Sequence, residues 1–115
     1  MKLRAEAETK EEKVEAGAEQ TTVRWLIGEP EGAPNFALRL FELAPGGYTP
    51  LHRHTWEHEV YILEGKAEIA FPSGPVAAKT GDAILIEPEE EHQFRNPDLK
   101  ESLRFLCIIP LLPKS

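Results

Sequence analysis

Residues 46–65 read GGYTPLHRHTWEHEVYILEG and contain three of the four histidines of the chain. His52 and His54 are two residues apart, so on an extended strand their side chains point to the same side. His58 has the same parity, and His92 lies in a later segment that an antiparallel barrel can bring beside the first three. Imidazole is the commonest metal-ligating group in proteins. The spacing therefore predicts one metal site made by all four histidines.

The rest of the chain indicates an all-β fold, a single antiparallel barrel or sandwich. Short apolar or alternating runs recur at roughly ten-residue spacing, with Gly and Pro between them, and no helical pattern of useful length interrupts them. The second expected strand is closed by Pro45-Gly46-Gly47, and the last by Pro110 and Pro113. The runs expected to form strands are 23–27, 36–43, 60–63, 66–71, 83–86 and 105–109.

Length and composition exclude several classes of protein. The 115 residues are enough for one domain. A net charge of −7 repels phosphate backbones, which argues against nucleic-acid binding. No run approaches the roughly 18 apolar residues of a membrane span, and the start does not resemble a signal peptide. We therefore expect a cytoplasmic protein. One cysteine excludes an intrachain disulfide.

Residues 1–20 differ in composition from the rest. They contain six Glu and four Lys or Arg among few apolar residues. We expect 1–20 to form an N-terminal arm, mobile or docked on a partner subunit, and 21–115 to form the barrel domain. Ten prolines with only two Asn and two Gln are typical of a thermophilic source.

Two motifs resemble those of the cupin superfamily over residues 21–112. The first motif has His58 where the family usually has Glu, and the second has Glu87-Pro88-Glu89 where a Pro-x-Gly turn is usual. Glu59 is an alternative third ligand, although the spacing to Gly65 fits His58 better. The motifs are Gly46-x5-His52-x-His54-x3-His58-x6-Gly65 and Gly81-x10-His92-x3-Asn96.

The chain further resembles the small single-domain cupins of thermophiles that hold manganese through four histidines. Gly32-Ala33-Pro34-Asn35-Phe36 and Trp56-Glu57-His58-Glu59 also carry this likeness. The resemblance implies a β-barrel with a metal inside its mouth, and commonly a homodimer.

The ligand set determines the charge of the metal centre. Four neutral imidazoles leave a divalent ion with its full charge, whereas a Glu ligand would reduce that charge, so the ion is the stronger Lewis acid and favours anionic ligands. An octahedral ion would keep two open positions, while tetrahedral zinc would be closed and structural. Imidazole suits iron, nickel, copper and zinc better than manganese. The resemblance favours manganese, with iron second.

Five further residues are candidates for the pocket wall. Arg39 interrupts an apolar run and either points inward, to hold a substrate carboxylate, or outward to solvent. Trp56 either walls the pocket or fills the core or an interface. Phe94 shares the parity of His92, and Phe105 and Cys107 are placed to close the barrel floor. Cys107 is expected to be inert packing, with a redox or ligand role as the alternative.

Liganding histidines usually donate their second N–H to an acceptor, for which Glu57, Glu59 and backbone carbonyls are candidates. No histidine is left to act as a general base. The first functional hypothesis is a dioxygenase-like oxidoreductase acting on a small anionic or enolisable substrate. The alternatives are a Lewis-acid isomerase, lyase or decarboxylase, and a nonenzymatic module that binds a small molecule.

Overall fold

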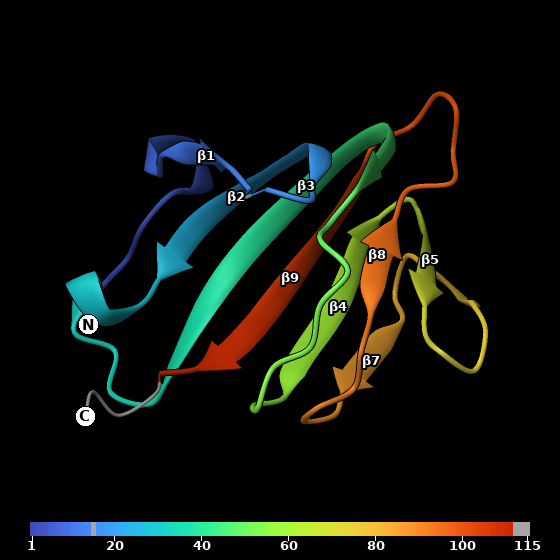
Figure 1. The fold of residues 1–115 in the computed structure, drawn as a ribbon. Helices are drawn as coiled ribbons and strands as arrows, with labels where there is room; N and C mark the ends of the chain where they lie inside the picture. The colour runs from blue at the N-terminus through green and yellow to red at the C-terminus, as the bar shows by residue number, and fades with distance from the viewer. Residues whose placement is uncertain (15, 112–115) are drawn as a thin grey trace.

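Strand β3 is the longest strand and joins the two walls of the fold. The computed structural model describes residues 1–14 and 16–111. Every recorded strand pair is antiparallel, in the order β6-β5-β8-β3-β9-β4-β7, with β2 on β3 and β1 on β2 (Figure 1). The strands are β1 Glu11–Lys13, β2 Glu19–Ile27, β3 Phe36–Tyr48, β4 His58–Glu64, β5 Lys66–Ala70, β6 Val76–Lys79, β7 Ala83–Ile86, β8 Gln93–Arg95 and β9 Leu103–Pro110.

This architecture confirms the predicted all-β antiparallel fold. Two short 3-10 turns, η1 Glu6–Glu8 and η2 Glu29–Glu31, are the helical elements of the described residues. In residues 1–14 and 16–111, no helix is both long and apolar enough to cross a membrane.

The expected end of the second strand at Pro45-Gly46-Gly47 is wrong, because β3 continues to Tyr48. Gly46 has a φ of 77°, and the pairing with β2 shifts register between Glu19 and Thr21, so the strand bends instead of stopping. Beyond the bend Tyr48 pairs with Arg95 of β8. One strand therefore pairs with β9 in one wall and with β8 in the other.

Short strands were missed where the sequence gives little apolar signal. All three residues of β1 are charged and exposed, and β6 has only one buried residue, Ala78. By contrast, the strand segment expected after Pro88 is present as β8, three residues long, with Phe94 buried at its centre. These strands form because neighbouring strands accept their backbone hydrogen bonds, and such long-range pairing leaves no local sequence pattern.

The described part of the N-terminal segment packs on its own chain. Arg24 donates hydrogen bonds to the carbonyl oxygen of Thr9 and to Glu11, and Arg4 forms a 2.8 Å ion pair with Glu31. The expected boundary between 1–20 and 21–115 falls inside β2, which starts at Glu19. Docking on a partner subunit stays a prediction. Pro113 and the rest of 112–115 lie outside the described residues.

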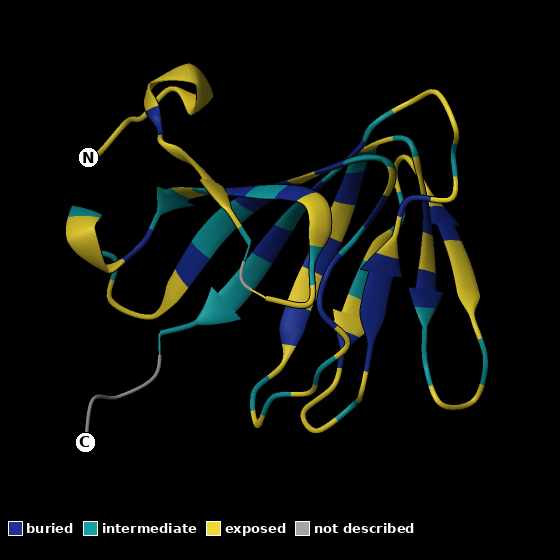
Figure 2. Ribbon diagram, turned by 45° about the horizontal axis from the view of Figure 1, so that its top comes forward, coloured by how far each residue is buried: buried dark blue, intermediate teal, exposed yellow. Residues whose placement is uncertain are grey.

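The core lies between the two walls. Buried and exposed residues alternate along β4, as expected for a strand with one face inward (Figure 2). Phe94 of β8 stacks on Phe105 of β9 with ring centroids 4.8 Å apart, and Phe41 of β3 stacks on the same ring at 5.2 Å. Since β8 and β9 do not pair, these contacts show that the sheet curls until its two walls face each other.

Replacing Gly65 by alanine is expected to destabilise the fold by about 2–4 kcal/mol. Gly65 joins β4 to β5 with a φ of 93°, and an added Cβ would lie 2.6 Å from the carbonyl oxygen of Ser102. Gly81 is a matched control, because its φ is 92° but no described atom lies within 4 Å of an added Cβ. Urea unfolding should show a loss of only about 1 kcal/mol for Gly81→Ala. Equal losses in the two variants would contradict this account.

Candidate functional site

The two walls enclose a cavity of about 250 Å³. All four histidines line it, together with the five predicted pocket residues, Arg39, Trp56, Phe94, Phe105 and Cys107. None of the lining residues recorded for the described chain is Asp or Glu. The wall is therefore made of imidazoles, aromatic and aliphatic side chains, one guanidinium, the Thr49 hydroxyl and the Cys107 thiol.

Strand register determines which side chains enter the cavity. Arg39 of β3 pairs directly with Cys107 of β9, and Cys107 pairs on its other side with Val60 of β4. His58 lies two residues before Val60, so it faces inward as a diagonal neighbour of Cys107. Beyond the cavity, the inward faces of the same strands carry buried apolar residues such as Ile62. The polar side chains of these inward faces therefore lie at the end that lines the cavity.

The other three histidines reach the cavity without belonging to a regular strand. His52 and His54 lie in the loop between β3 and β4, and His92 directly precedes β8. His52 and His92 form an isolated antiparallel bridge, with backbone N–H to carbonyl distances of 3.2 and 3.0 Å. This bridge brings the second motif beside the first.

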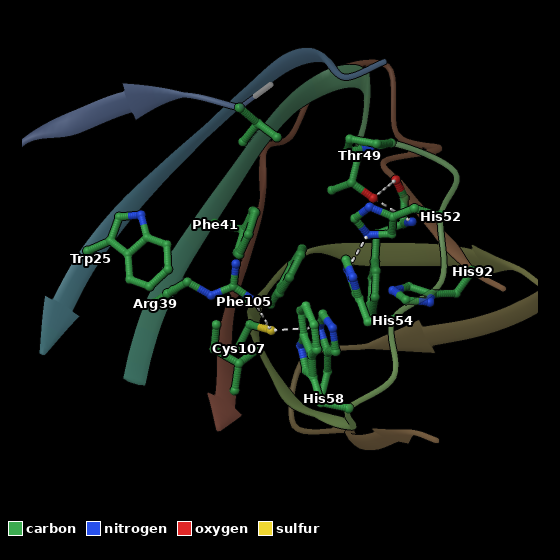
Figure 3. A pocket seen from close by; sticks show the side chains of 15 residues that line it. Trp25, Arg39, Phe41, Thr49, His52, His54, His58, His92, Phe105 and Cys107 are labelled. Carbon is green, nitrogen blue, oxygen red and sulfur yellow. Dashed lines mark hydrogen bonds between the residues drawn. The ribbon is translucent and has the colours of Figure 1, made fainter. Parts of the chain in front are cut away.

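The four imidazoles form a compact cluster (Figure 3). Five histidine pairs have ring centroids between 4.2 and 6.2 Å apart, and the Nε2 atoms of His52 and His54 are 3.2 Å apart. Two nitrogens bound to one ion at about 2.0–2.1 Å would be about 3.0–3.4 Å apart. As they stand, however, the described His, Cys, Asp and Glu side chains include no group of three or more placed to hold one ion.

The contacts made by the Nδ1 atoms of two of the rings, His92 and His58, fit a role of these rings as metal ligands. Nδ1 of His92 lies 2.8 Å from the carbonyl oxygen of Glu90, so this nitrogen donates and Nε2 keeps its lone pair. Nδ1 of His58 lies 3.5 Å from Sγ of Cys107, while its Nε2 is buried with no hydrogen-bond partner among the described residues. A buried nitrogen without a partner is costly, and a bound cation would satisfy it.

The predicted carboxylate partners of the histidines do not face the cluster. Glu59 is exposed and, with Glu57, lines a different surface hollow beside Phe36 and Pro110. Glu59 therefore does not lie where a third ligand would be needed. The partners found instead are the Glu90 carbonyl, which accepts from His92, and the Cys107 thiol beside His58.

Burial keeps His52, His58 and His92 neutral at pH 7. Desolvation, reinforced by the positive charge of Arg39 and by the other histidines, lowers the pKa of His58 to about 3. Desolvation and the neighbouring histidines lower the pKa of His52 to about 4, and burial also lowers the pKa of His92. Neutral imidazoles have the free lone pairs that metal binding requires.

Metal-free protein is expected to lose stability as the pH falls from about 6.5 towards 4. The unfolded chain takes up protons near the ordinary histidine pKa, whereas folded His58 stays neutral until about pH 3. One such histidine lowers the free energy of unfolding by up to about 1.4 kcal/mol for each pH unit of acidification. Urea unfolding in a chelator, at several pH values, measures the slope. The His58→Asn variant should show a shallower dependence of unfolding free energy on pH. Identical slopes in the variant and the wild type would refute the assignment of this pH dependence to His58.

The remaining predicted pocket residues lie around the cluster. Trp56 stacks on His54 with ring centroids 4.4 Å apart. Arg39 points inward and donates a 3.1 Å hydrogen bond from Nη2 to Sγ of Cys107. Burial raises the pKa of the Cys107 thiol, although Arg39 acts in the opposite direction. Its sulfur thus connects the guanidinium to His58.

Several lining residues were not predicted, notably Trp25, Phe41 and Thr49. Trp25 of β2 pairs with Arg39 of β3, so both belong to one patch of the wall. The alternation in β3 puts Phe41 on the same face as Arg39, a signal that the sequence contains. The pairing of β2 with β3 is not visible in the sequence.

The conserved-domain model for the cupin domain matches residues 39–109, which include every histidine and every predicted pocket residue. The chain is a cupin. Its sequence and structure are similar to those of several characterised members. The solved structure of the polyketide cyclase RemF from Streptomyces resistomycificus is 41% identical, with a TM-score of 0.89, covering 96% of this cupin and 79% of that chain.

Two curated relatives have different names. The 1-methylthio-D-xylulose 5-phosphate methylsulfurylase of Rhodospirillum rubrum is 39% identical over 72 residues, which are 63% of this cupin and 46% of that protein. The oxalate-binding protein of Thermotoga maritima is 36% identical over 78 residues, covering 64% of each chain. This cupin thus spans about half to two-thirds of the length of these relatives.

Proposed function

We propose that this cupin binds one divalent metal ion through His52, His54, His58 and His92. The observation that carries the proposal is the convergence of four imidazoles in one cavity, with the buried Nε2 of His58 lacking any partner among the described residues. When bound, such an ion would supply Lewis acidity and, if redox-active, electrons for a reaction with dioxygen. Manganese is the proposed metal and iron the second choice, with nickel, copper and zinc as further possibilities.

The proposed activity is that of a dioxygenase-like oxidoreductase acting on a small anionic or enolisable substrate. The cavity wall supports a small substrate, because its volume is below the about 300–1,000 Å³ of pockets for drug-sized ligands. Its aromatic lining, including Phe41, Phe94 and Phe105, would exclude water from the reacting end. With all imidazoles used as ligands and no carboxylate among the recorded lining residues, protons must move through the substrate or solvent.

A second candidate is Lewis-acid chemistry without a redox step, such as isomerisation, lyase chemistry or decarboxylation. The likeness to a solved polyketide cyclase favours it, since the name of that protein describes ring closure and not oxidation. The likeness to an oxalate-binding protein supports the alternative that this cupin binds a small molecule without converting it.

Oxygen uptake by the manganese-loaded protein with a panel of enolisable acids tests the first candidate. We expect uptake that requires substrate and is lost in His52→Ala. Exchange of manganese for redox-inert zinc should abolish an oxidoreductase but can leave a Lewis-acid enzyme active. Full turnover by His52→Ala would exclude the histidine-bound ion from the chemistry, and tight substrate binding without turnover would favour a binding module.

We further propose that this cupin acts as a cytoplasmic homodimer. Large apolar side chains stand exposed on the outer side of the sheet, with Phe36, Tyr61 and Leu85 each between 46% and 60% accessible. Tyr61 of β4 and Leu85 of β7 lie on paired strands, so they form one patch suited to contact with a second copy. Light scattering of the purified protein measures its mass directly.

A further inference from the structure

Arg39 is an inward-facing guanidinium with no anionic partner recorded among the described residues. It extends from β3 into the cavity, between Trp25 on one side and Cys107 on the other (Figure 3). Of its five N–H groups, one is donated to Sγ of Cys107. Its Nε is buried with no hydrogen-bond partner among the described residues. Donors of this fixed planar geometry are suited to a carboxylate.

No described carboxylate is recorded in an ion pair with Arg39. Three other arginines, Arg4, Arg24 and Arg104, form ion pairs with glutamates, whereas none is recorded for Arg39 within residues 1–14 and 16–111. The recorded cavity wall has no carboxylate to neutralise it. Arg39 is half-buried, and a partly desolvated charge without a counterion is unfavourable, so a bound anion would improve this arrangement.

Aromatic rings hold the guanidinium and shape the space around it. Its Cζ lies 4.9 Å from the ring centroid of Phe41 and 5.2 Å from that of Trp25. Cation–π contacts of this kind fix the position of the charge without neutralising it. Phe94 and Phe105 continue the apolar wall towards the histidines. The space next to the guanidinium therefore favours a flat, unsaturated group.

Arg39 and the histidines define the two ends of a short ligand. The sulfur of Cys107 lies 3.1 Å from Nη2 of Arg39 and 3.5 Å from Nδ1 of His58. An anion on Arg39 consequently has its remaining atoms directed along the wall towards the imidazole cluster. A long or highly branched acid would not fit a cavity of about 250 Å³.

We propose that Arg39 binds the carboxylate of a small aromatic or unsaturated acid and thereby selects the substrate of this cupin. The inference deepens the proposed function, because the far end of that acid would face the proposed metal ligands. Anion binding by Arg39 itself does not require a metal. Carboxylate binding by Arg39 and metal binding by the histidines can therefore be refuted separately.

Benzoate and its uncharged analogue benzamide test the proposal. Calorimetric titration of the full chain, both as purified and after treatment with a chelator, should show benzoate binding at least about ten-fold more tightly than benzamide. The preference should persist without metal. Equal binding of the two compounds, or no binding of benzoate by either preparation, would overturn the proposal. Loss of the preference after chelation alone would show that the metal, and not Arg39, recognises the carboxylate.

Variants assign the preference to the residue. Arg39→Gln should weaken benzoate binding about 10–100-fold and leave benzamide unchanged, while Arg39→Lys should retain part of the preference. Arg95→Gln is the matched control, because Arg95 also stacks on an aromatic ring, that of Tyr48, but does not line the cavity. Benzoate affinity unchanged in Arg39→Gln, or lowered equally in Arg95→Gln, would refute the assignment. The comparison of benzoate with benzamide on the wild-type chain stands even if a variant fails to fold.

Discussion

His58→Ala is expected to weaken divalent metal binding at least about 100-fold. Loss of an outer hydrogen bond to a metal ligand typically costs about 10–100-fold in affinity, so loss of a ligand should cost more. His58 is the ring for which the argument is strongest, because it is 7% exposed and its Nε2 has no partner among the described residues. Calorimetric titration of manganese into metal-free protein measures the change.

Glu59→Ala is the matched control for that experiment. Glu59 is the next residue in β4, is exposed, and stays outside the cavity. Its loss should change the affinity by less than about two-fold, since an exposed charge interacts weakly through water. A large effect in Glu59→Ala with little effect in His58→Ala would show that the carboxylate, not the imidazole, is the third ligand.

The second large effect expected is a rise of about 15 °C in the midpoint of thermal unfolding when the metal is added. A ligand present at 1,000 times its Kd stabilises the folded state by about 4 kcal/mol, and 1 kcal/mol shifts the midpoint of a domain of this size by about 4 °C. The effect is large because neutral imidazoles held close together bind the ion only in the folded chain. Calorimetric scans with and without manganese measure it.

Two controls distinguish specific binding from a general ionic effect. Magnesium prefers oxygen ligands and should produce almost no shift. With manganese at the same concentration, His58→Ala should show a rise of no more than about 6 °C, because a 100-fold weaker affinity leaves about 1.4 kcal/mol of stabilisation. Its unfolding midpoint without metal reports whether the variant is folded. An equal rise with magnesium, or an undiminished rise in His58→Ala, would contradict a site made by the histidines.

The sequence allowed the strands and the approximate site to be predicted because both leave local patterns. Alternation along 66–71 and the Gly and Pro residues between runs are short-range signals of strands and turns. The expected antiparallel barrel brings His92 beside His52, and the likeness of the two histidine motifs to cupin motifs supports the same placement. In the structure a backbone bridge joins these two residues.

The orientation of Arg39 could not be predicted, because its run has apolar residues at both parities. Leu38, Leu40 and Phe41 all surround it in sequence, so alternation does not distinguish the inward from the outward face. The face is set by pairing with β2 and β9, which places Arg39 opposite Trp25 and Cys107. Register of this kind depends on residues far apart in the chain.

The continuation of β3 past its Pro-Gly-Gly segment was missed for a related reason. Such residues usually end a strand, but they can also bend a continuous strand so that it joins two walls of the sheet. A Cβ added at Gly47 would lie only 2.8 Å from the carbonyl oxygen of Gln20, and glycine avoids this collision. Only the position of β2 reveals this close approach.

Metal analysis of the chain purified without added metal is the decisive test of the four-histidine metal site. Elemental mass spectrometry of the wild-type protein, with His58→Ala prepared in parallel, measures divalent metal per chain. The four-imidazole cluster predicts about one ion per wild-type chain, chiefly manganese or iron, and strong depletion in the variant. Wild-type protein with no stoichiometric divalent metal, which also takes up none when manganese is supplied, would contradict the account.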